Sequence, residues 1–107
     1  MEENIVEVSR SPWEQNPKLM QVSIPCEQYL FKENDPADNF YIIQEGEIEI
    51  SVNNGHQILA KLSPGSSFGE LALLGTGRRL ASAKATTVTK CLEISMKWMQ
   101  EELDRGL

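Results

Sequence analysis

The stretch EIEISVNNGHQILAKL, residues 47–62, constrains the fold more than any other part of the chain. In its first half, isoleucine and valine alternate with glutamate and serine, which is the two-residue period of a strand with one buried face. Asn53, Asn54 and Gly55 follow, and these residue types readily adopt the positive φ angles of a tight turn. The segment QILAKL then returns the chain. We predict a β-hairpin whose apolar face belongs to the core.

Other short runs of aromatic and β-branched residues lie between turn residues in the same way. QYLFK and NFYIIQ precede the hairpin, and RLASAKATTVTKCLEIS follows it, with a slip in its period near Thr89 that indicates a turn or a bulge. FGELALL alternates too little for a strand and is too short for an independent helix, so we predict a single helical turn there. This spacing of strands and turns is typical of a β-sandwich or barrel.

The tail MKWMQEELDRG is predicted to be a helix. It places Met96, Met99 and Leu103 on one helical face and ends in Gly106, a common helix stop. Methionine and tryptophan at this spacing are usually core residues, so we expect Met96, Met99 and Trp98 to be buried.

The chain has 107 residues, the size of one domain. Three prolines interrupt its first twenty-five residues. We expect residues 1–25 to form an N-terminal arm with short helical turns, packed through Trp13, Leu19 and Met20. Residues 26–107 are expected to form the folded domain.

Composition excludes several classes of function. The chain carries 10 basic and 16 acidic residues, whereas a nucleic-acid-binding domain usually presents a basic face. We expect no direct nucleic-acid partner, no membrane span and no leader, and therefore a cytoplasmic protein. Cys26, Cys91 and the single histidine, His56, have no metal-ligand spacing, so no metal is expected. We predict that both cysteines are buried free thiols and that His56 is a solvated turn residue.

The segment SSFGELALLGTGRRLAS, residues 66–82, contains the candidate site. Gly69 allows a ligand to approach the backbone, and a helical turn that begins near Glu70 has free N–H groups that suit an anion. The Arg79 guanidinium can pair with two phosphate oxygens, and the Glu70 carboxylate can accept hydrogen bonds from a sugar hydroxyl. Together these groups favour a ribose joined to a phosphate. The alternative is a surface salt bridge from Glu70 to Arg78 or Arg79, with ordinary core beside it.

The ordered set of residues in this segment resembles the phosphate-binding cassette of the cyclic nucleotide-binding domain family, F-G-E-x-A-L and then R-[AST]-A-[ST]. Counted from Phe68, the family arginine falls on Arg79, the alanine on Ala81 and the hydroxyl residue on Ser82. FKENDPADNFYIIQEGEIEI is similar to the family's entry, and the similarity covers about residues 26–95. The resemblance implies an eight-stranded antiparallel β-roll (jelly roll) with a short helical turn in the pocket and helical segments at the termini.

The resemblance also implies a set of ligand-binding residues. They are Gly69, Glu70, Leu71, Ala72, Arg79, Leu80, Ala81 and Ser82. Gly69 and Glu70 would serve the ribose 2′-hydroxyl, the amides of Leu71 and Ala72 would face the cyclic phosphate, and Arg79 would neutralise it. The backbone at Leu80 and Ala81 would close the other side.

Two positions depart from the family pattern. Leu80 stands where the family usually has Ala, Ser or Thr, and it offers no hydroxyl to the amino group of guanine, which favours cAMP over cGMP. Asn34 stands where a glycine is usual in the loop before the aromatic strand, and asparagine tolerates left-handed backbone angles. Arg78 is expected on the opposite side of a strand from Arg79, in solvent.

We therefore predict a non-enzymatic module that binds a cyclic nucleotide, cAMP above cGMP, and relays its occupancy through the terminal helices to an effector protein or an effector domain outside this chain. The base of the bound nucleotide would be capped by Trp98, by a neighbouring chain or by neither. The alternative is a degenerate β-roll that acts as a nucleotide-free interaction or dimerisation domain, which Leu80 supports. A cupin-type enzyme, which also uses a β-roll, needs several histidines for its metal, and this chain has one.

Overall fold

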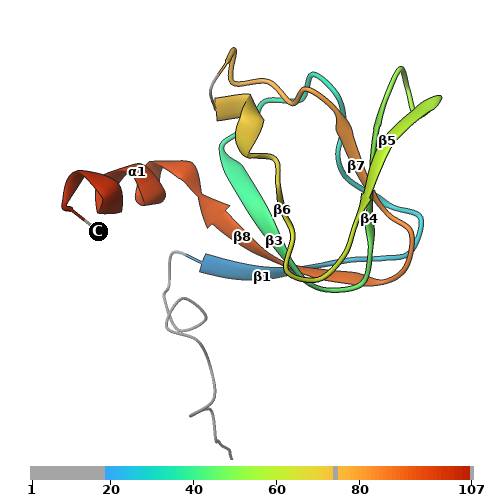
Figure 1. The fold of residues 1–107 in the computed structure, drawn as a ribbon, viewed down its shortest axis with the longest axis horizontal. Helices are drawn as coiled ribbons and strands as arrows, with labels where there is room; N and C mark the ends of the chain where they lie inside the picture. The colour runs from blue at the N-terminus through green and yellow to red at the C-terminus, as the bar shows by residue number, and fades with distance from the viewer. Residues whose placement is uncertain (1–18, 74, 107) are drawn as a thin grey trace, which may run out of the picture.

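The computed structural model describes residues 19–73 and 75–106, which form two four-stranded antiparallel sheets. One sheet has the order β1-β8-β3-β6 and the other β2-β7-β4-β5. The predicted eight-stranded β-roll is confirmed, as is its helical turn, η2 (Figure 1). The elements are β1 (Leu19–Ile24), β2 (Tyr29–Phe31), β3 (Asn39–Glu45), β4 (Ile48–Val52), β5 (Gln57–Leu62), β6 (Ser67–Phe68), η2 (Glu70–Leu73), β7 (Ser82–Ala85), β8 (Thr89–Ser95) and α1 (Met96–Asp104).

The predicted hairpin is formed by β4 and β5. Its turn residues Asn53, Asn54 and Gly55 have φ angles of 58, 57 and 87°. However, the register between the strands shifts after Ile50, and Ser51, which was expected on the wet face, is buried. Ile50 pairs with Ala60 and Ser51 with Ile58, so the extra residue of this β-bulge is Leu59 on β5. The alternation of buried and wet residues predicted for β4 fails at Ser51.

The N-terminal part of the chain differs from the predicted arm. Residues Leu19–Ile24 form β1, which pairs along its whole length with β8. Leu19 is buried as expected, but Met20 is 58% exposed because it faces away from the core on an edge strand. The prolines near both ends of this strand masked its signal in the sequence. The expected contact through Trp13 lies outside the described residues.

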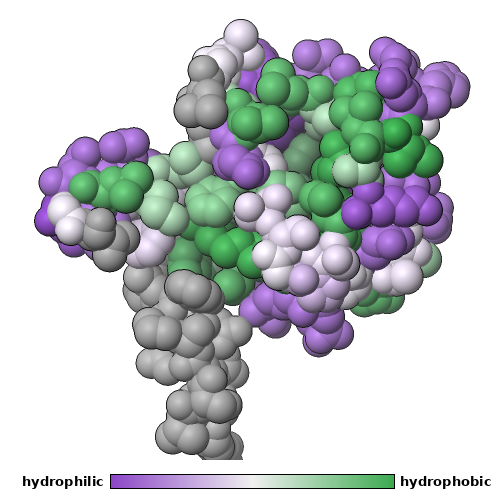
Figure 2. Space-filling view, viewed as in Figure 1, coloured by the Kyte–Doolittle hydropathy of each residue, from purple (hydrophilic) through white to green (hydrophobic). Residues whose placement is uncertain are grey.

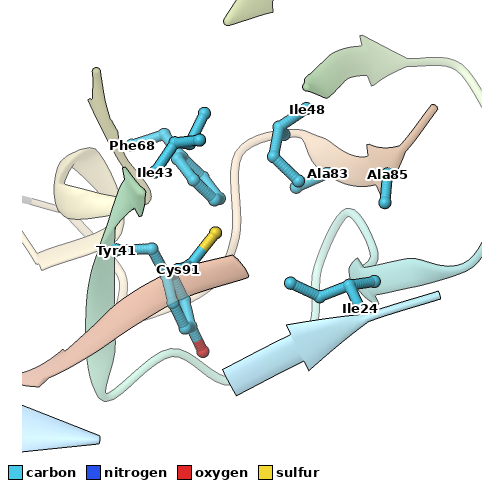
Figure 3. Close-up of a cluster of buried hydrophobic side chains, with 8 residues drawn as sticks. All are labelled: Ile24, Tyr41, Ile43, Ile48, Phe68, Ala83, Ala85 and Cys91. Carbon is cyan, nitrogen blue, oxygen red and sulfur yellow. The ribbon is translucent and has the colours of Figure 1, made fainter. Parts of the chain in front are cut away.

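The core lies between the two sheets. Both sheets contribute its side chains, which Figure 3 shows pointing toward one another: Ile24, Tyr41, Ile43, Ile48, Phe68, Ala83, Ala85 and Cys91. The alanines on β7 leave room for the larger residues opposite. The slip in period near Thr89 is confirmed as a turn over residues 86–88, which separates β7 from β8.

The two cysteines are both free thiols, but only Cys91 is buried. The prediction of burial is wrong for Cys26, which lies in the exposed turn after Pro25. Its Sγ donates to the carbonyl oxygen of Thr86 at 3.2 Å. A turn residue outside the sheets has no facing layer to cover it. His56 is exposed, as predicted.

The predicted C-terminal helix is confirmed as α1. The Ser95 side chain caps it by accepting from the amide of Trp98 at 3.2 Å, and Gly106 follows it with a φ of 89°. The expected burial of its apolar face is wrong, because none of its residues is buried and Leu103 is 53% exposed. Figure 1 gives the reason: α1 extends beyond the end of β8 and away from the roll.

Candidate functional site

A pocket of about 230 Å³ lies where η2 and the chain entering β7 face the second sheet. Figure 2 shows hydrophobic surface over η2 and over the β4–β5 hairpin, with a hollow between them. The residues that line the pocket are Phe31, Ile50, Ser67, Phe68, Gly69, Glu70, Leu71, Ala72, Arg79, Leu80 and Ala81. Seven of the eight predicted site residues are in this lining, so the fold brings them together.

Backbone hydrogen bonds to the loop before β3 position Arg79. The amide of Asn34 donates to the Arg79 carbonyl at 2.8 Å, and the Arg79 amide donates to the Asp35 carbonyl at 2.8 Å. Asn34 has a φ of 76°, so it adopts the left-handed conformation predicted for it. Ala37 adds a third bond by donating to the Gly77 carbonyl at 2.9 Å. Segments forty or more residues apart in the sequence are thus joined directly at the pocket.

The Arg79 side chain is buried inside the pocket wall, with 4% of the residue exposed. Its Nη1 donates to the Gly69 carbonyl at 3.0 Å, and its Cζ lies 4.0 Å from the centroid of the Phe31 ring. Nε is buried without a hydrogen-bond partner among the described atoms. Desolvation lowers the pKa of this guanidinium, while Tyr41 and Asp35 act in the opposite direction. The pocket therefore contains a desolvated cation with a free donor.

Tyr41, whose ring centroid lies 5.6 Å from the Arg79 Cζ, forms a polar contact with Glu93. The Tyr41 hydroxyl donates to Glu93 Oε2 at 2.8 Å. Burial, with this hydrogen bond as the next cause, raises the pKa of Tyr41 to about 12. The tyrosine is therefore neutral at physiological pH, so it does not balance the positive charge of Arg79.

The segment from Gly69 to Ala72 forms the other wall. Gly69 has a φ of 91°, and an added Cβ there would lie 2.8 Å from Arg79 Nη1, so this position requires glycine. In η2, Ala72 is buried, whereas Glu70 and Leu71 are exposed. The Glu70 carboxylate is thus free to meet a ligand from solvent.

The alternative of a salt bridge from Glu70 to Arg78 or Arg79 finds no support in the described part of the chain. Across residues 19–73 and 75–106, the ion pairs are Lys84–Glu27, Lys90–Glu45 and Arg105–Glu102. Arg78 is exposed, as predicted, and its Nη1 donates to the Asn34 carbonyl at 3.3 Å.

The remaining predicted site residues divide into two groups. Leu80 is 58% exposed at the mouth of the pocket, and Ala81 is half-buried beside it. Ser82 lies outside the lining: it is buried, and its hydroxyl accepts from the amide of Glu33 at 2.9 Å. The Ser82 hydroxyl is therefore hydrogen-bonded to the backbone of the loop before β3. Trp98, the candidate cap, is half-buried on α1 and is not part of the lining.

Sequence reasoning missed four lining residues: Phe31, Ile50, Ser67 and Phe68. Phe68 is the first residue of the cassette pattern and Ser67 precedes it, so the FGE signal itself would have found them. Phe31 and Ile50 come from distant strands, and their aromatic and β-branched character is equally typical of plain core. No local signal distinguishes those two roles.

The fold and the pocket together define a β-roll with a cationic pocket. The cyclic nucleotide-binding domain family matches residues 21–105, and the chain belongs to that family. A cAMP-dependent protein kinase regulatory subunit from Emericella nidulans is 36% identical over 73 residues, which are 68% of this chain and 18% of the relative. The match thus spans about a fifth of that relative's length.

Solved structures lead to the same family. The Thermus thermophilus catabolite activator protein has a TM-score of 0.74 and 26% identity, covering 92% of this chain and 49% of its own. The regulatory domain of Toxoplasma gondii PKA, crystallised with cAMP, has a TM-score of 0.67 and 28% identity, covering 73% of this chain and 31% of its own.

The described residues lack two other kinds of feature, a metal-binding cluster and a membrane-spanning helix. Residues 19–73 and 75–106 contain no group of His, Cys, Asp and Glu side chains that could hold a metal ion. In the same ranges no helix has the length and hydrophobicity needed to cross a membrane.

Proposed function

We propose that this chain is a non-enzymatic cAMP-binding regulatory module. The observation that carries the proposal is Arg79, a buried guanidinium with an unpartnered Nε in the wall of a pocket. Burying a charge without a partner is costly, and an anion that accepts from this cation removes the cost. Phosphate suits it because a guanidinium can donate to two phosphate oxygens at once.

The walls of the pocket supply the other contacts in this proposal. Gly69 and the Glu70 carboxylate bind the ribose 2′-hydroxyl, and the amides of Leu71 and Ala72 face the cyclic phosphate opposite Arg79. The exposure of Glu70 supports its role, since a carboxylate beside a phosphate must point at a hydroxyl rather than at the phosphate. The relatives add support, because the Toxoplasma gondii structure contains cAMP.

The side of the pocket near the base favours adenine over guanine. Leu80 and Ala81 close this side in the proposal, and the exposed Leu80 side chain presents only carbon to the ligand. A guanine amino group buried against it would lose a hydrogen bond to water without replacement. Ser82 is assigned a supporting role, since its hydroxyl already binds the Glu33 amide.

Occupancy of the pocket is relayed, in this proposal, through α1 to an effector protein or to a domain outside this chain. A helix with no buried residue has little to hold it in one place. It can therefore have a second arrangement that ligand binding favours. The cytoplasmic location remains a prediction.

Isothermal titration of the purified protein with cAMP and with cGMP tests the proposal. The Arg79→Ala variant should lose about 3–5 kcal/mol of binding free energy, a hundredfold or more in Kd, because it removes the cation that pairs with the phosphate. Arg78→Ala is the matched control: it removes an exposed arginine at the adjacent position and should leave Kd unchanged.

The outcome of this titration distinguishes a cAMP receptor from a nucleotide-free interaction domain. Saturable cAMP binding that Arg79→Ala abolishes establishes the receptor, and tighter binding of cGMP overturns the specificity argument from Leu80. If neither nucleotide binds at millimolar concentration, the alternative of a nucleotide-free interaction domain holds. Leu71 and Leu80, which are 59% and 58% exposed at the pocket mouth, would then be its contact surface.

A further inference from the structure

Arg79 is held in an unusual way for a buried cation. Buried arginines usually pair with a carboxylate, yet in the described ranges no carboxylate lies within ion-pair distance of it. Asp35, Asp38 and Glu93 attract the guanidinium only from further away. Some other contact must therefore fix where this cation lies in the pocket.

The contact is aromatic. The Arg79 Cζ lies over the Phe31 ring at 4.0 Å from its centroid and over the Tyr41 ring at 5.6 Å. Cation–π attraction is stronger where the partners are desolvated, and here Arg79 and Tyr41 are buried while Phe31 is half-buried. Phe31 is held in turn by Tyr41 and Phe68, whose ring centroids each lie 6.0 Å from its own.

An aromatic partner, unlike a carboxylate, does not occupy the N–H donors of the guanidinium. The N–H groups of arginine lie in its plane and point outward from its edge, whereas an aromatic ring attracts its face. A carboxylate partner would have occupied the donors that a phosphate needs. The Arg79 Cζ lies 4.0 Å from the Phe31 centroid, Nη1 donates to the Gly69 carbonyl, and Nε has no hydrogen-bond partner among the described atoms.

We propose that Phe31 is a positioning residue for the anion site: its ring holds the Arg79 guanidinium in place without occupying Nε, so that a phosphate meets a preformed cation. This inference rests on the proposed function for its ligand. It assigns a role to a residue of β2 that lies 48 positions before the arginine, outside the segment with the cassette pattern. Preorganisation of this kind lowers the ordering cost of binding.

The first experiment compares ligands with and without a phosphate on the full chain. Phe31→Leu keeps an apolar side chain in the pocket but removes the ring, and it should weaken cAMP binding by about tenfold. Adenosine, which has no phosphate, should bind Phe31→Leu and wild type with the same affinity. Equal losses for cAMP and adenosine would overturn the proposal, since Phe31 would then be an ordinary wall of the pocket.

Phe40→Leu is the matched control. Phe40 lies on β3, is half-buried like Phe31 and is outside the pocket lining. The same chemical change there should lower thermal stability without changing the affinity for cAMP. If Phe31→Leu does not fold, a fluorinated phenylalanine at position 31 keeps the shape of the ring and weakens its attraction for a cation, and cAMP affinity should fall as fluorines are added.

A readout without nucleotide keeps this inference separate from the proposed function. In a proton–nitrogen spectrum of the free protein, the Arg79 Nε–H should give a solvent-protected signal shifted by the ring current of Phe31. Phe31→Leu should move that signal and expose it to exchange, whereas Phe40→Leu should not. If Phe31→Leu leaves the Arg79 signal unmoved, the role of Phe31 is overturned even if cAMP binds. If the wild-type protein does not bind cAMP, the proposed function is overturned, and this signal still decides the role of Phe31.

Discussion

At the scale of single residues, the pocket depends on two backbone conformations that most side chains avoid. Gly69 has a φ of 91° with the Arg79 side chain against it, and Asn34 has a φ of 76° with its amide on the Arg79 carbonyl. Glycine is required at the first position, because a Cβ would displace the cation. The second position has room for asparagine, a residue type that tolerates left-handed angles.

Replacing Asn34 tests whether conformation is what this position contributes. Asn34→Ala should lower the free energy of unfolding by about 1–2 kcal/mol, the cost of a left-handed angle for a residue with a Cβ and no local polar compensation. Asn34→Gly should change it by less than about 0.5 kcal/mol, because relief of backbone strain offsets the greater freedom of the unfolded chain. Urea unfolding measures both. Equal losses in the two variants would instead assign the effect to the asparagine side chain.

At the scale of elements, the β4–β5 hairpin and the helix α1 differ in how far they depend on tertiary contacts. The β4–β5 hairpin follows from its turn residues, and only its bulge after Ile50 required the tertiary structure. The helix α1 depends still less on tertiary packing. Its cap and its stop are local, and none of its residues is buried, so packing contributes little to its stability.

Hydrogen exchange at α1 tests the relay. In the free protein the amides of residues 96–104 should exchange quickly, since short helices without buried side chains open locally. Saturating cAMP should slow their exchange several-fold as the helix takes up a second, packed arrangement. The amides of β8, inside the core sheet, are the internal control and should remain slow throughout. Unchanged exchange at α1 with the pocket full would contradict a relay through this helix.

At the scale of the whole molecule, the two sheets close over a core that excludes water from Cys91. Burial raises the pKa of the Cys91 thiol from 9.0 to about 11. The folded state therefore binds this proton more tightly than the unfolded state. Its contribution to stability is complete below pH 9 and is lost as the pH rises through 11.

The free energy of unfolding should accordingly fall between pH 9 and 11, by at most about 1.4 kcal/mol per pH unit from this group. Cys91→Ala should be less stable overall, but its stability should decline less over that interval. Cys26→Ser, which changes the exposed thiol, should keep the wild-type slope. Chemical denaturation at a series of pH values gives all three slopes, and identical slopes for wild type and Cys91→Ala would show that the thiol titrates alike in both states.

Local patterns along the chain were sufficient for much of the fold and for the segment that contains the site. The turn Asn53-Asn54-Gly55, the helical turn at Glu70 and the helix after Ser95 all agree with the structure, because each depends on the conformational preferences of adjacent residues. The cassette from Phe68 to Ala81 was found for the same reason: its residues are neighbours in sequence as well as in the pocket.

Tertiary structure alone decided the features that join distant segments. It placed Leu19–Ile24 in the roll as β1, left α1 without buried residues and directed the Ser82 hydroxyl to the Glu33 amide. It also set the Phe31 ring of β2 against the Arg79 guanidinium, which lies in the segment before β7. A phenylalanine in a strand has the same local pattern whether it faces a cation or other carbon atoms. What it contacts is decided only when the sheets pack.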